Sequence, residues 1–297
     1  MIVALTGATG FLGGHVLAQL AGHDVRALAR RPQAARAGVT WITGALDDDA
    51  ALGQLCAGAE AVIHVAGVVN GDAEAFDAGN RLGTIAMLSA AAASGAHRFI
   101  HVSSIAAREP QLSLYGRSKR AAEDAVVASP LDWCVVRPPA IYGPGDTDNL
   151  ELFRCARRGL FPLPPRGRMS VIHAADMARL IVTLARGGPS RTIYEADDGL
   201  PGGWNHGDFA RAIGSAVGRR VATVALPAAL VRAGAAIDQA LRGPRAKLTR
   251  DRAAYFCHPD WVIDPAKRPP LALWTPQIAT VAGLAATAHW YRTEGWL

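Results

Sequence analysis

The chain opens with a short apolar run, Ile2–Thr6, that leads directly into the glycine-rich segment Gly7–Gly13. Where a strand passes through glycines into a helix, backbone N–H groups and the positive end of the helix meet without obstruction by side chains. The regular spacing of the three glycines favours a pyrophosphate-binding turn, because an ordinary tight turn explains only the first of them. The residues expected to contact this ligand are Gly7, Thr9, Gly10, Phe11, Leu12 and Gly13.

Apolar runs of strand length alternate with helical stretches through the first half of the chain. Expected strands are Ile2–Thr6, Val25–Ala29, Thr40–Ile42, Ala61–Val65, Arg98–Val102 and Trp133–Arg137. Expected helices are Leu12–Leu20, Ala50–Leu55, Arg81–Ala93 and Tyr115–Ala128. This rhythm predicts an α/β fold with a doubly wound parallel sheet of the Rossmann type.

The composition changes after Arg137, where proline and glycine crowd Pro138–Asp146 and Pro162–Gly167 and predict loops rather than sheet. The sheet domain returns at Val171–Arg186 and Thr192–Ala196. We therefore expect a nucleotide-binding domain over residues 1–148 and 171–200. A smaller, mostly helical substrate lobe is expected over residues 149–170 and 201–297, with elements at Phe209–Val217, Val221–Val224, Ala228–Leu241 and Ile278–Tyr291.

Composition limits the partners of the chain. The net charge is +6, but arginines are spread from Arg26 to Arg292 without a basic block interleaved with aromatics, which disfavours nucleic acid. Four cysteines lack metal-ligand spacing, so reduced thiols and no metal are expected. No signal peptide or membrane span is recognisable, which predicts a cytoplasmic protein without a membrane partner. The expected helices at Arg81–Ala93 and Tyr115–Ala128 are the candidates for a homodimer interface.

Tyr115 and Lys119 form the second informative pattern. They stand four residues apart within an expected helix and therefore share one face. An ammonium group beside a phenol stabilises the phenolate, so the pair can give and take a proton. Together with the glycine turn, this pair indicates a nicotinamide-dependent enzyme whose ligand contacts include both side chains.

The end of the second expected strand bears on the choice of cofactor. A site for NAD normally presents an acidic residue there to the ribose hydroxyls, but this chain has Ala29. Arg30 and Arg31 follow at once and offer guanidinium donors that match a phosphate monoester. We therefore expect NADP(H), with NAD(H) as the less favoured cofactor, although Arg31 in particular also fits a solvated surface role.

Further motifs follow in a fixed order along nearly the whole chain. They are Val62–Gly67, Asn80–Thr84, His101–Ile105, Arg137–Asp146 and Val171–Asp176. With the glycine turn and the Tyr/Lys pair, this series resembles the extended short-chain dehydrogenase/reductase family. That family includes NAD(P)-dependent epimerases and dehydratases and enzymes similar to 3β-hydroxysteroid dehydrogenase and dihydroflavonol reductase.

The resemblance implies roles for individual residues. Ser104 would hydrogen-bond the reacting oxygen, Tyr115 would exchange the proton, Lys119 would bind the nicotinamide ribose, and Asn80 would help to hold the site. Ser103 is a weaker serine candidate, because it points to the other face of its strand. Further cofactor contacts are expected at Leu46, Val65, Ala66, Gly67, Pro138 and Ile141. Substrate contacts are expected at Val68, Ser104, Ile105, Tyr115, Pro139, Ala140 and Arg168, the last of which also fits an exposed loop.

Two departures from the family pattern inform the choice of substrate. Members that act on nucleotide sugars usually have asparagine where this chain has Ala140 and arginine where it has Met169. The pocket is therefore expected to be more apolar, and the predicted reaction interconverts a secondary alcohol and a ketone or aldehyde on a small apolar molecule with NADP(H). A nucleotide-sugar epimerase or dehydratase remains one alternative. A non-catalytic NADP-binding sensor or assembly protein is another, which the retained proton donor disfavours.

Overall fold

The computed structural model describes residues 1–243, 246 and 248–297. The chain forms two compact units, described here in turn. Unit 1 comprises residues 1–138, 177–195 and 267–274, and unit 2 comprises residues 139–176, 196–266 and 275–297. The division into domains expected from the sequence stays a prediction, because compactness alone does not show which parts fold independently.

Unit 1 is built on a sheet of seven strands in the order β11-β6-β5-β4-β1-β2-β3. Every neighbouring pair is parallel. The strand order reverses between β1 and β4, which is where such sheets bind nucleotides at their carboxyl ends. The doubly wound fold expected from the sequence is thus confirmed. The strands are β1 (Ile2–Thr6), β2 (Asp24–Ala29), β3 (Val39–Thr43), β4 (Ala61–His64), β5 (Arg98–Val102), β6 (Asp132–Val136) and β11 (Thr192–Tyr194).

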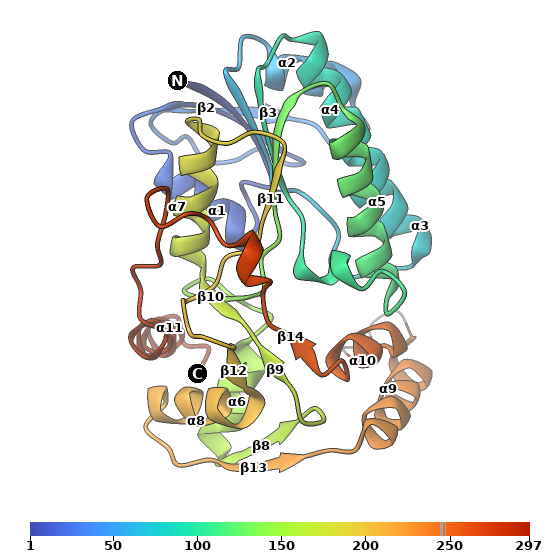
Figure 1. The fold of residues 1–297 in the computed structure, drawn as a ribbon, viewed down its shortest axis with the longest axis vertical. Helices are drawn as coiled ribbons and strands as arrows, with labels where there is room; N and C mark the ends of the chain where they lie inside the picture. The colour runs from blue at the N-terminus through green and yellow to red at the C-terminus, as the bar shows by residue number, and fades with distance from the viewer. Residues whose placement is uncertain (244–245, 247) are drawn as a thin grey trace. The chain divides into compact units, whose positions relative to one another are not determined.

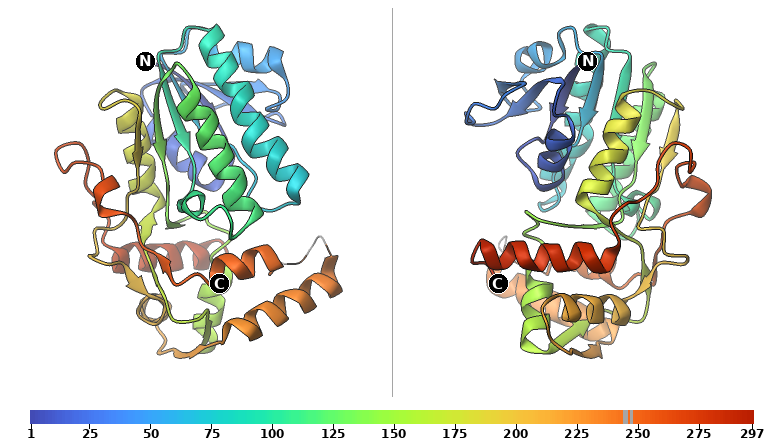
Figure 2. Two further views of the ribbon diagram at one scale, coloured as in Figure 1. Left: turned by 45° about the vertical axis from the view of Figure 1, so that its right-hand side comes forward. Right: turned by 90° about the vertical axis from the view of Figure 1, so that its left-hand side faces the viewer.

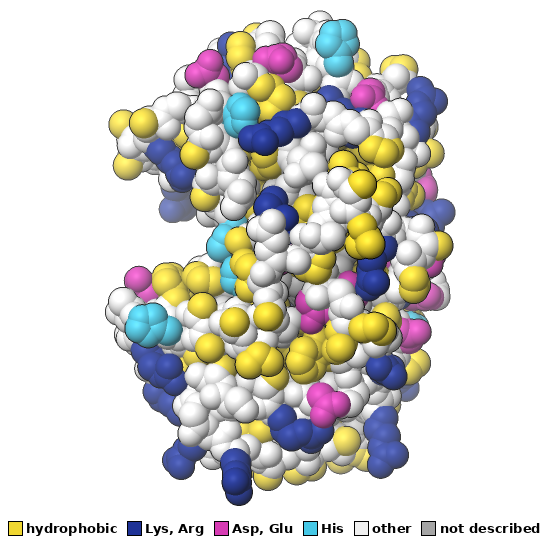
Figure 3. All heavy atoms as spheres, turned by 60° about the vertical axis from the view of Figure 1, so that its left-hand side comes forward, with side chains coloured by type: hydrophobic (Ala, Val, Ile, Leu, Met, Phe, Trp, Pro, Cys, Tyr) yellow, Lys and Arg dark blue, Asp and Glu magenta, His cyan; other side chains and the backbone are white. Residues whose placement is uncertain are grey.

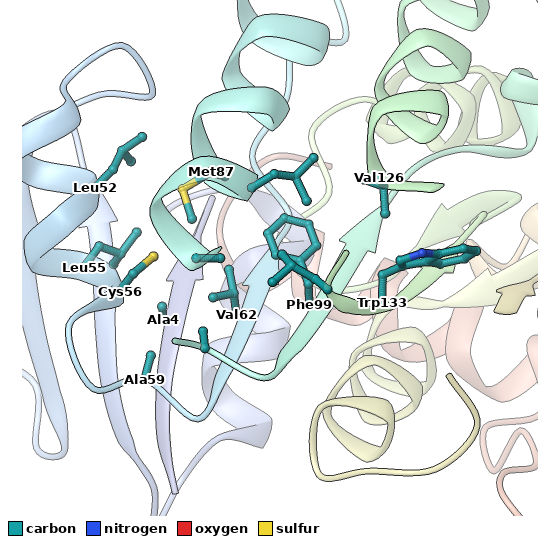
Figure 4. Close-up of a cluster of buried hydrophobic side chains, with 14 of the residues drawn as sticks. Ala4, Leu52, Leu55, Cys56, Ala59, Val62, Met87, Phe99, Val126 and Trp133 are labelled. Atoms are coloured by element: carbon teal, nitrogen blue, oxygen red, sulfur yellow. The ribbon is translucent and has the colours of Figure 1, made fainter. Parts of the chain in front are cut away.

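Helices cover both faces of this sheet (Figures 1 and 2). One face carries α1 (Phe11–Gln19) and α7 (Ala174–Ala185), and the other carries α2 (Asp49–Cys56), α4 (Gly83–Ala93) and α5 (Leu114–Ala128). Side chains from the strands and from the second group of helices interlock in a buried apolar cluster (Figure 4). Its members include Val62, Phe99, Trp133, Met87 and Val126. Burial of these side chains stabilises the sheet that holds the site.

Short helical segments complete unit 1 near the carboxyl ends of the strands. α3 (Ala73–Phe76) continues into a π-helical turn, η1 (Asp77–Leu82), before α4 begins. η2 (Ile105–Arg108) is a 3-10 turn that follows β5. The sequence predicted one helix from Arg81, whereas the structure inserts the π turn first. Such turns are frequent at functional sites, and this one carries Asn80.

Unit 2 contains short strands where the sequence predicted loops. β7 (Ala140–Tyr142) pairs in parallel with β10 (Val171–His173). β8 (Leu160–Leu163) pairs in parallel with β13 (Ala222–Ala225), although it contains Pro162. The expected loops at Pro138–Asp146 and Pro162–Gly167 are corrected to this extent. A two-stranded ribbon tolerates proline, because only one edge of each strand needs its N–H groups.

The remaining elements of unit 2 are a small mixed sheet and five helices of the described chain. β9 (Arg168–Met169) lies between β12 (Trp204–Asn205) and β14 (Asp260–Trp261). The helices are α6 (Leu150–Arg158), α8 (His206–Ala216), α9 (Ala228–Arg242), α10 (Arg250–Phe256) and α11 (Thr280–Thr293), and a 3-10 turn η4 spans Pro265–Lys267. The sequence analysis placed residues 149–170 in the substrate lobe without naming a helix there, and it did not predict α6 or α10.

Two apolar clusters hold unit 2 together. The larger one joins α6, α8 and α11, where the rings of Phe153 and Tyr291 meet edge to face at 5.0 Å between centroids. The smaller one lies between α9 and α10 and contains Val231, Ala235 and Ala253. The pair α9 and α10 therefore has a small core of its own, and the two helices lie side by side in Figures 1 and 2.

Candidate active site

The glycine turn has the geometry that a bound pyrophosphate requires. Gly7 has φ of +75°, and a Cβ atom there would lie 2.7 Å from the backbone nitrogen of Ala66. A Cβ atom on Gly13 would lie 1.9 Å from the carbonyl oxygen of Gly7. Gly10 precedes α1 without a side-chain cap, so the N–H groups of the first helical turn remain available to an anion. These residues fit the phosphates of a dinucleotide.

Thr6 and His64 tie β1 to β4 directly beneath this turn. The Thr6 hydroxyl accepts a hydrogen bond from the Ala66 N–H at 3.2 Å and shares another with His64 Nδ1 at 2.7 Å. His64 Nε2 lies 3.1 Å from the Thr84 hydroxyl. Burial lowers the pKa of His64 to about 3, so the ring is neutral and acts as a structural link. The sequence analysis did not identify Thr6, although its place immediately before Gly7 was a usable signal.

The predicted phosphate-binding arginines line a pocket at the end of β2. This pocket has a volume of about 390 Å³ and is bounded by Thr9, Arg30, Arg31 and Gln33. The Gln33 side chain donates to the carbonyl oxygens of Arg31 and Pro32 at 3.0 and 3.2 Å, which shapes the loop. The structure thus gathers Thr9 with both arginines and adds Gln33, which the sequence analysis missed.

Asn80 fixes the backbone that follows β4. Its Oδ1 atom accepts from the Val68 N–H at 2.7 Å, while its Nδ2 atom donates to the Val68 carbonyl at 3.0 Å and to Ser118 Oγ at 2.8 Å. Ser118 in turn donates to the carbonyl oxygen of Tyr115 at 2.8 Å. Because Asn80 is only 2% exposed, these bonds form in a low dielectric and are correspondingly strong. Asn80 therefore links the β4 edge to the helix that carries the predicted proton donor.

Lys119 approaches the same edge from α5. Its side chain is 4% exposed, and Nζ donates to the carbonyl oxygen of Val102 at 3.0 Å. A Cβ atom on Gly67 would lie 3.1 Å from this Nζ and 2.8 Å from Asn80 Oδ1. Burial lowers the pKa of Lys119 to about 8, against the opposing effect of the Glu123 carboxylate. Gly67, Asn80 and Lys119 thus meet at one point, where any larger residue in place of the glycine would collide.

Ser104 and Tyr115 lie where β5 ends and α5 begins. Ser104 is 8% exposed, and its hydroxyl accepts the Ala106 N–H at 3.2 Å. A Cβ atom on Gly116 would lie 2.7 Å from the Ala106 carbonyl oxygen, so η2 packs tightly on the first turn of α5. Tyr115 is partly exposed, and the Phe76 ring lies 6.0 Å from its ring. Ser104 thus lies at the start of η2, and Tyr115 and Lys119 lie on the adjoining helix α5. The catalytic role of the three residues stays a prediction.

Two further polar side chains are buried next to this set. His101 stacks on His64 with 5.5 Å between ring centroids, and burial lowers its pKa well below the usual value. Within the described residues, neither ring nitrogen of His101 has a hydrogen-bond partner, and the Ser103 hydroxyl has none either. Ser103 and Ser104 are both buried, at 4% and 8% exposure, so the preference for Ser104 stays a prediction.

A buried ion pair anchors the middle of α5. Arg137 donates to both carboxylate oxygens of Glu123, at 2.8 and 2.6 Å, and to Glu195 at 3.2 Å. All three side chains are at most 5% exposed. Removing one partner of such a group leaves an uncompensated charge in the interior, so the group fixes the position of the helix that presents Lys119.

The other predicted site residues lie in both units. In unit 1, Leu46 contacts the start of α4, Val65 and Ala66 adjoin Gly7, and Pro138 accepts a hydrogen bond from the N–H of Ile105 at 2.9 Å. In unit 2, β7 contains Ala140 and Ile141 directly after Pro139, and the exposed Arg168 donates to the Gly203 carbonyl oxygen at 3.2 Å. Their contacts with cofactor or substrate stay predictions.

The described residues also differ from the patterns of metal sites and membrane-spanning helices. Among them, no group of three or more His, Cys, Asp or Glu side chains lies in an arrangement that would hold a metal ion. No helix in the described part of the chain combines the length and apolar character needed to span a bilayer. On the face drawn in Figure 3, Lys and Arg side chains are spread over the surface among residues of other types.

The sequence and the fold of this chain resemble those of several known proteins. A family model described as NAD(P)H-binding matches residues 7–186. Over its whole length the chain is 40% identical to a ceramide reductase of Caulobacter vibrioides, of which the match covers 96%. The solved structure of MoeE5 with UDP-glucuronic acid and NAD has a TM-score of 0.74 at 20% identity, over 99% of both chains. A UDP-glucose 4-epimerase of Thermotoga maritima has a TM-score of 0.73 at 17% identity, also over 99% of both chains.

The parallel sheet, the glycine turn and the family-model match define an NAD(P)-binding enzyme. The two solved structures support the fold alone, because they are less than a quarter identical to this chain. Since the family model spans more than half of the sequence and the motifs follow in order, the chain belongs to the extended short-chain dehydrogenase/reductase family. This confirms the resemblance inferred from the sequence.

Proposed function

We propose that this protein is an NADPH-dependent reductase that converts a ketone on a ceramide-like lipid into a secondary alcohol. The observation that carries the proposal is the meeting of Asn80, Lys119 and the bare backbone of Gly67 beside the glycine turn. This arrangement supports a nicotinamide ribose next to a proton-transferring phenol. The match to a ceramide reductase at 40% identity over the full chain supports the substrate class.

The chain's own residues account for the chemistry of such a reduction. When bound, NADPH supplies a hydride from C4 of its nicotinamide ring. The hydroxyls of Ser104 and Tyr115 would donate hydrogen bonds to the substrate oxygen, which positions and polarises the carbonyl group. Tyr115 would then give its proton to the oxygen as the carbonyl carbon gains the hydride. The nearby ammonium of Lys119 favours the resulting phenolate, which regains a proton from solvent.

The pocket at the end of β2 supports NADPH over NADH. Arg30 and Arg31 both line it, and no acidic side chain stands at the strand end, where Ala29 is buried. A 2′-phosphate placed there would form charge-assisted hydrogen bonds of about 1.5–3 kcal/mol each, which is enough for a clear preference. An NAD site would instead need a carboxylate for the ribose hydroxyls.

Two other functions are alternatives to this proposal. A nucleotide-sugar epimerase has the same overall fold, but Ala140 and Met169 lack the side chains expected to hold the diphosphate and sugar in that class. A protein that only binds NADP would have no use for Ser104, Tyr115 and Lys119 together. The retained set and the apolar substitutions therefore favour the reductase.

The test is a substrate comparison with the purified full-length chain. NADPH is mixed with a ceramide whose 3-hydroxyl has been oxidised to a ketone, dispersed in detergent, and NADPH absorbance is followed. UDP-glucose serves as the comparison substrate. The proposal expects NADPH loss that matches formation of the alcohol and no change of the sugar. Conversion of the sugar, with NADPH unchanged in the presence of the keto-lipid, would contradict it.

A further inference from the structure

Helix α9 (Ala228–Arg242) exposes an apolar stripe. Leu230, Ile237 and Leu241 are seven and four residues apart and therefore lie on one helical face. Their side chains are 59%, 61% and 80% exposed. Ala233 and Gly234 are also exposed and extend this face with small residues. We call Leu230, Ile237 and Leu241 the α9 stripe.

The α9 stripe is not the face by which the helix joins unit 2. Val231 and Ala235 of α9 are buried against Ala253 of α10, and their positions are rotated around the helix axis away from those of the stripe. A surface helix ordinarily turns polar residues outward once its apolar face is covered. Helix α9 instead has large apolar side chains at exposed positions as well as on its buried face, so its exposed face suits contact with something outside the chain.

The charge around α9 is strongly positive. Residues 219–252 contain eight Lys and Arg but only two Asp, whereas the remaining sequence contains 23 residues of each sign. The whole net charge of +6 therefore belongs to this stretch. One of its two carboxylates, Asp238, forms an ion pair with Arg242 at 3.2 Å within the helix. Of the cations in this segment, Arg219 and Arg220 precede β13 and Arg232 lies on α9, and all three are exposed.

We infer that the α9 stripe docks the enzyme reversibly on an anionic lipid bilayer. An exposed apolar helix face gains free energy at the boundary between headgroups and acyl chains, and the positive charge of the segment that contains it adds attraction to anionic headgroups. A second copy of this chain is a poorer occupant, because a two-fold contact through α9 would bring two segments of charge +6 together. The choice of a bilayer also rests on the proposed function, since a ceramide-like substrate resides in one.

The experiment is vesicle flotation of the full-length chain without NADPH or substrate, so that its outcome does not depend on the proposed reaction. One set of vesicles contains equal parts of phosphatidylcholine and phosphatidylglycerol, and the other contains phosphatidylcholine alone. Leu241→Glu tests the stripe. Leu271→Glu is its matched control, because Leu271 in unit 1 is 78% exposed and the change in size and charge is identical. Far-UV circular dichroism and the midpoint of urea unfolding report that each variant is folded.

We expect the natural chain to float with the anionic vesicles, to bind neutral vesicles weakly and to be released by salt. Leu241→Glu should weaken anionic binding about tenfold, whereas Leu271→Glu should leave it nearly unchanged. Ile237→Glu should repeat the effect of Leu241→Glu at a second point of the stripe. Arg219→Gln with Arg220→Gln should reduce the binding and its dependence on salt.

Three results would overturn the inference. The first is failure of the natural chain to float with anionic vesicles. The second is equal binding by Leu241→Glu and Leu271→Glu. The third is a dimer, seen by light scattering, that Leu241→Glu alone converts to monomer while vesicle binding stays unaffected, which would assign the stripe to contact between copies.

Discussion

Two helices of fifteen residues each, α5 in unit 1 and α9 in unit 2, depart from the usual amphipathic pattern in opposite directions. Helix α5 buries polar side chains, including Ser118, Lys119 and Glu123, whereas α9 exposes Leu230 and Ile237. Burial of a polar group is unfavourable unless a bond compensates it, and exposure of a large apolar group is unfavourable unless a partner covers it.

The two helices differ in where the partners of these unfavourable groups lie. The polar face of α5 is satisfied within the chain, by Asn80, by the Val102 carbonyl and by Arg137. The apolar face of α9 has no comparable cover among the described residues. We therefore assign α5 to chemistry inside the enzyme and α9 to contact with a surface outside it. The predictions that follow test the two assignments.

The largest expected effect concerns the first helix. Tyr115→Phe removes the proton donor while keeping the ring, so kcat should fall by about a hundredfold or more. The affinity for NADPH should change by less than about twofold, because the phenol contributes little to cofactor binding. Steady-state kinetics and fluorescence titration measure the two quantities. Unchanged kcat would remove Tyr115 from the mechanism, and Ile237→Ser in α9 should leave kcat on a short soluble ketone unaltered.

The next effect concerns cofactor choice. Arg30→Ala should weaken NADPH binding by about tenfold to a hundredfold and NADH binding far less, since only NADPH has the 2′-phosphate. Arg36→Ala is the matched control in the same loop, outside the lining of the pocket. Equal losses for both cofactors, or an equal loss in the control, would remove the phosphate role from Arg30.

A smaller effect separates two neighbouring histidines. His64→Leu should lower the free energy of unfolding by about 1–3 kcal/mol, because the hydroxyls of Thr6 and Thr84 lose a partner. His101→Leu should be neutral or stabilising, because it removes ring nitrogens that have no partner within the described chain. Urea unfolding of both variants tests the contrast, and a larger loss for His101→Leu would reverse it.

The smallest expected effect is a change in the free energy of unfolding with pH. The folded pKa of Lys119 is about 8, below its ordinary value of 10.5, so between these values the unfolded chain binds more protons than the folded chain. The contribution of Lys119 to the free energy of unfolding of the cofactor-free enzyme should therefore rise as the pH increases from about 8 to 10.5. Subtracting the profile of Lys119→Met isolates the contribution. A difference that falls over the same window would show that the lysine is favourably charged when folded.

The sheet and the glycine turn were predictable because their signals are local. Strand-length apolar runs recur at even intervals, and the positive φ of Gly7 requires glycine at that position. The strands β7 and β8 were missed, because each is short and depends on a partner many residues away. Helices α6 and α10, of nine and seven residues, are also short and were not expected.

The sequence names Asn80, Ser104, Tyr115 and Lys119 as candidate site residues, and their chemical roles stay predictions. The hydrogen bonds that connect them to their surroundings could not be predicted. The bond from Asn80 to Ser118 depends on the packing of the π turn against α5 and has no local signature. The α9 stripe was hidden for a related reason, since only the folded chain shows which apolar residues of an amphipathic helix stay exposed.

The most direct test of the account is transfer of deuterium. NADPH that carries deuterium at both C4 positions is incubated with the keto-ceramide and the full-length enzyme, and the product is analysed by mass spectrometry. The account predicts an alcohol that carries one deuterium on its carbinol carbon, with none formed by Tyr115→Phe at comparable times. An alcohol without deuterium, or no alcohol at all, would contradict the claim that this chain is an NADPH-dependent ketone reductase.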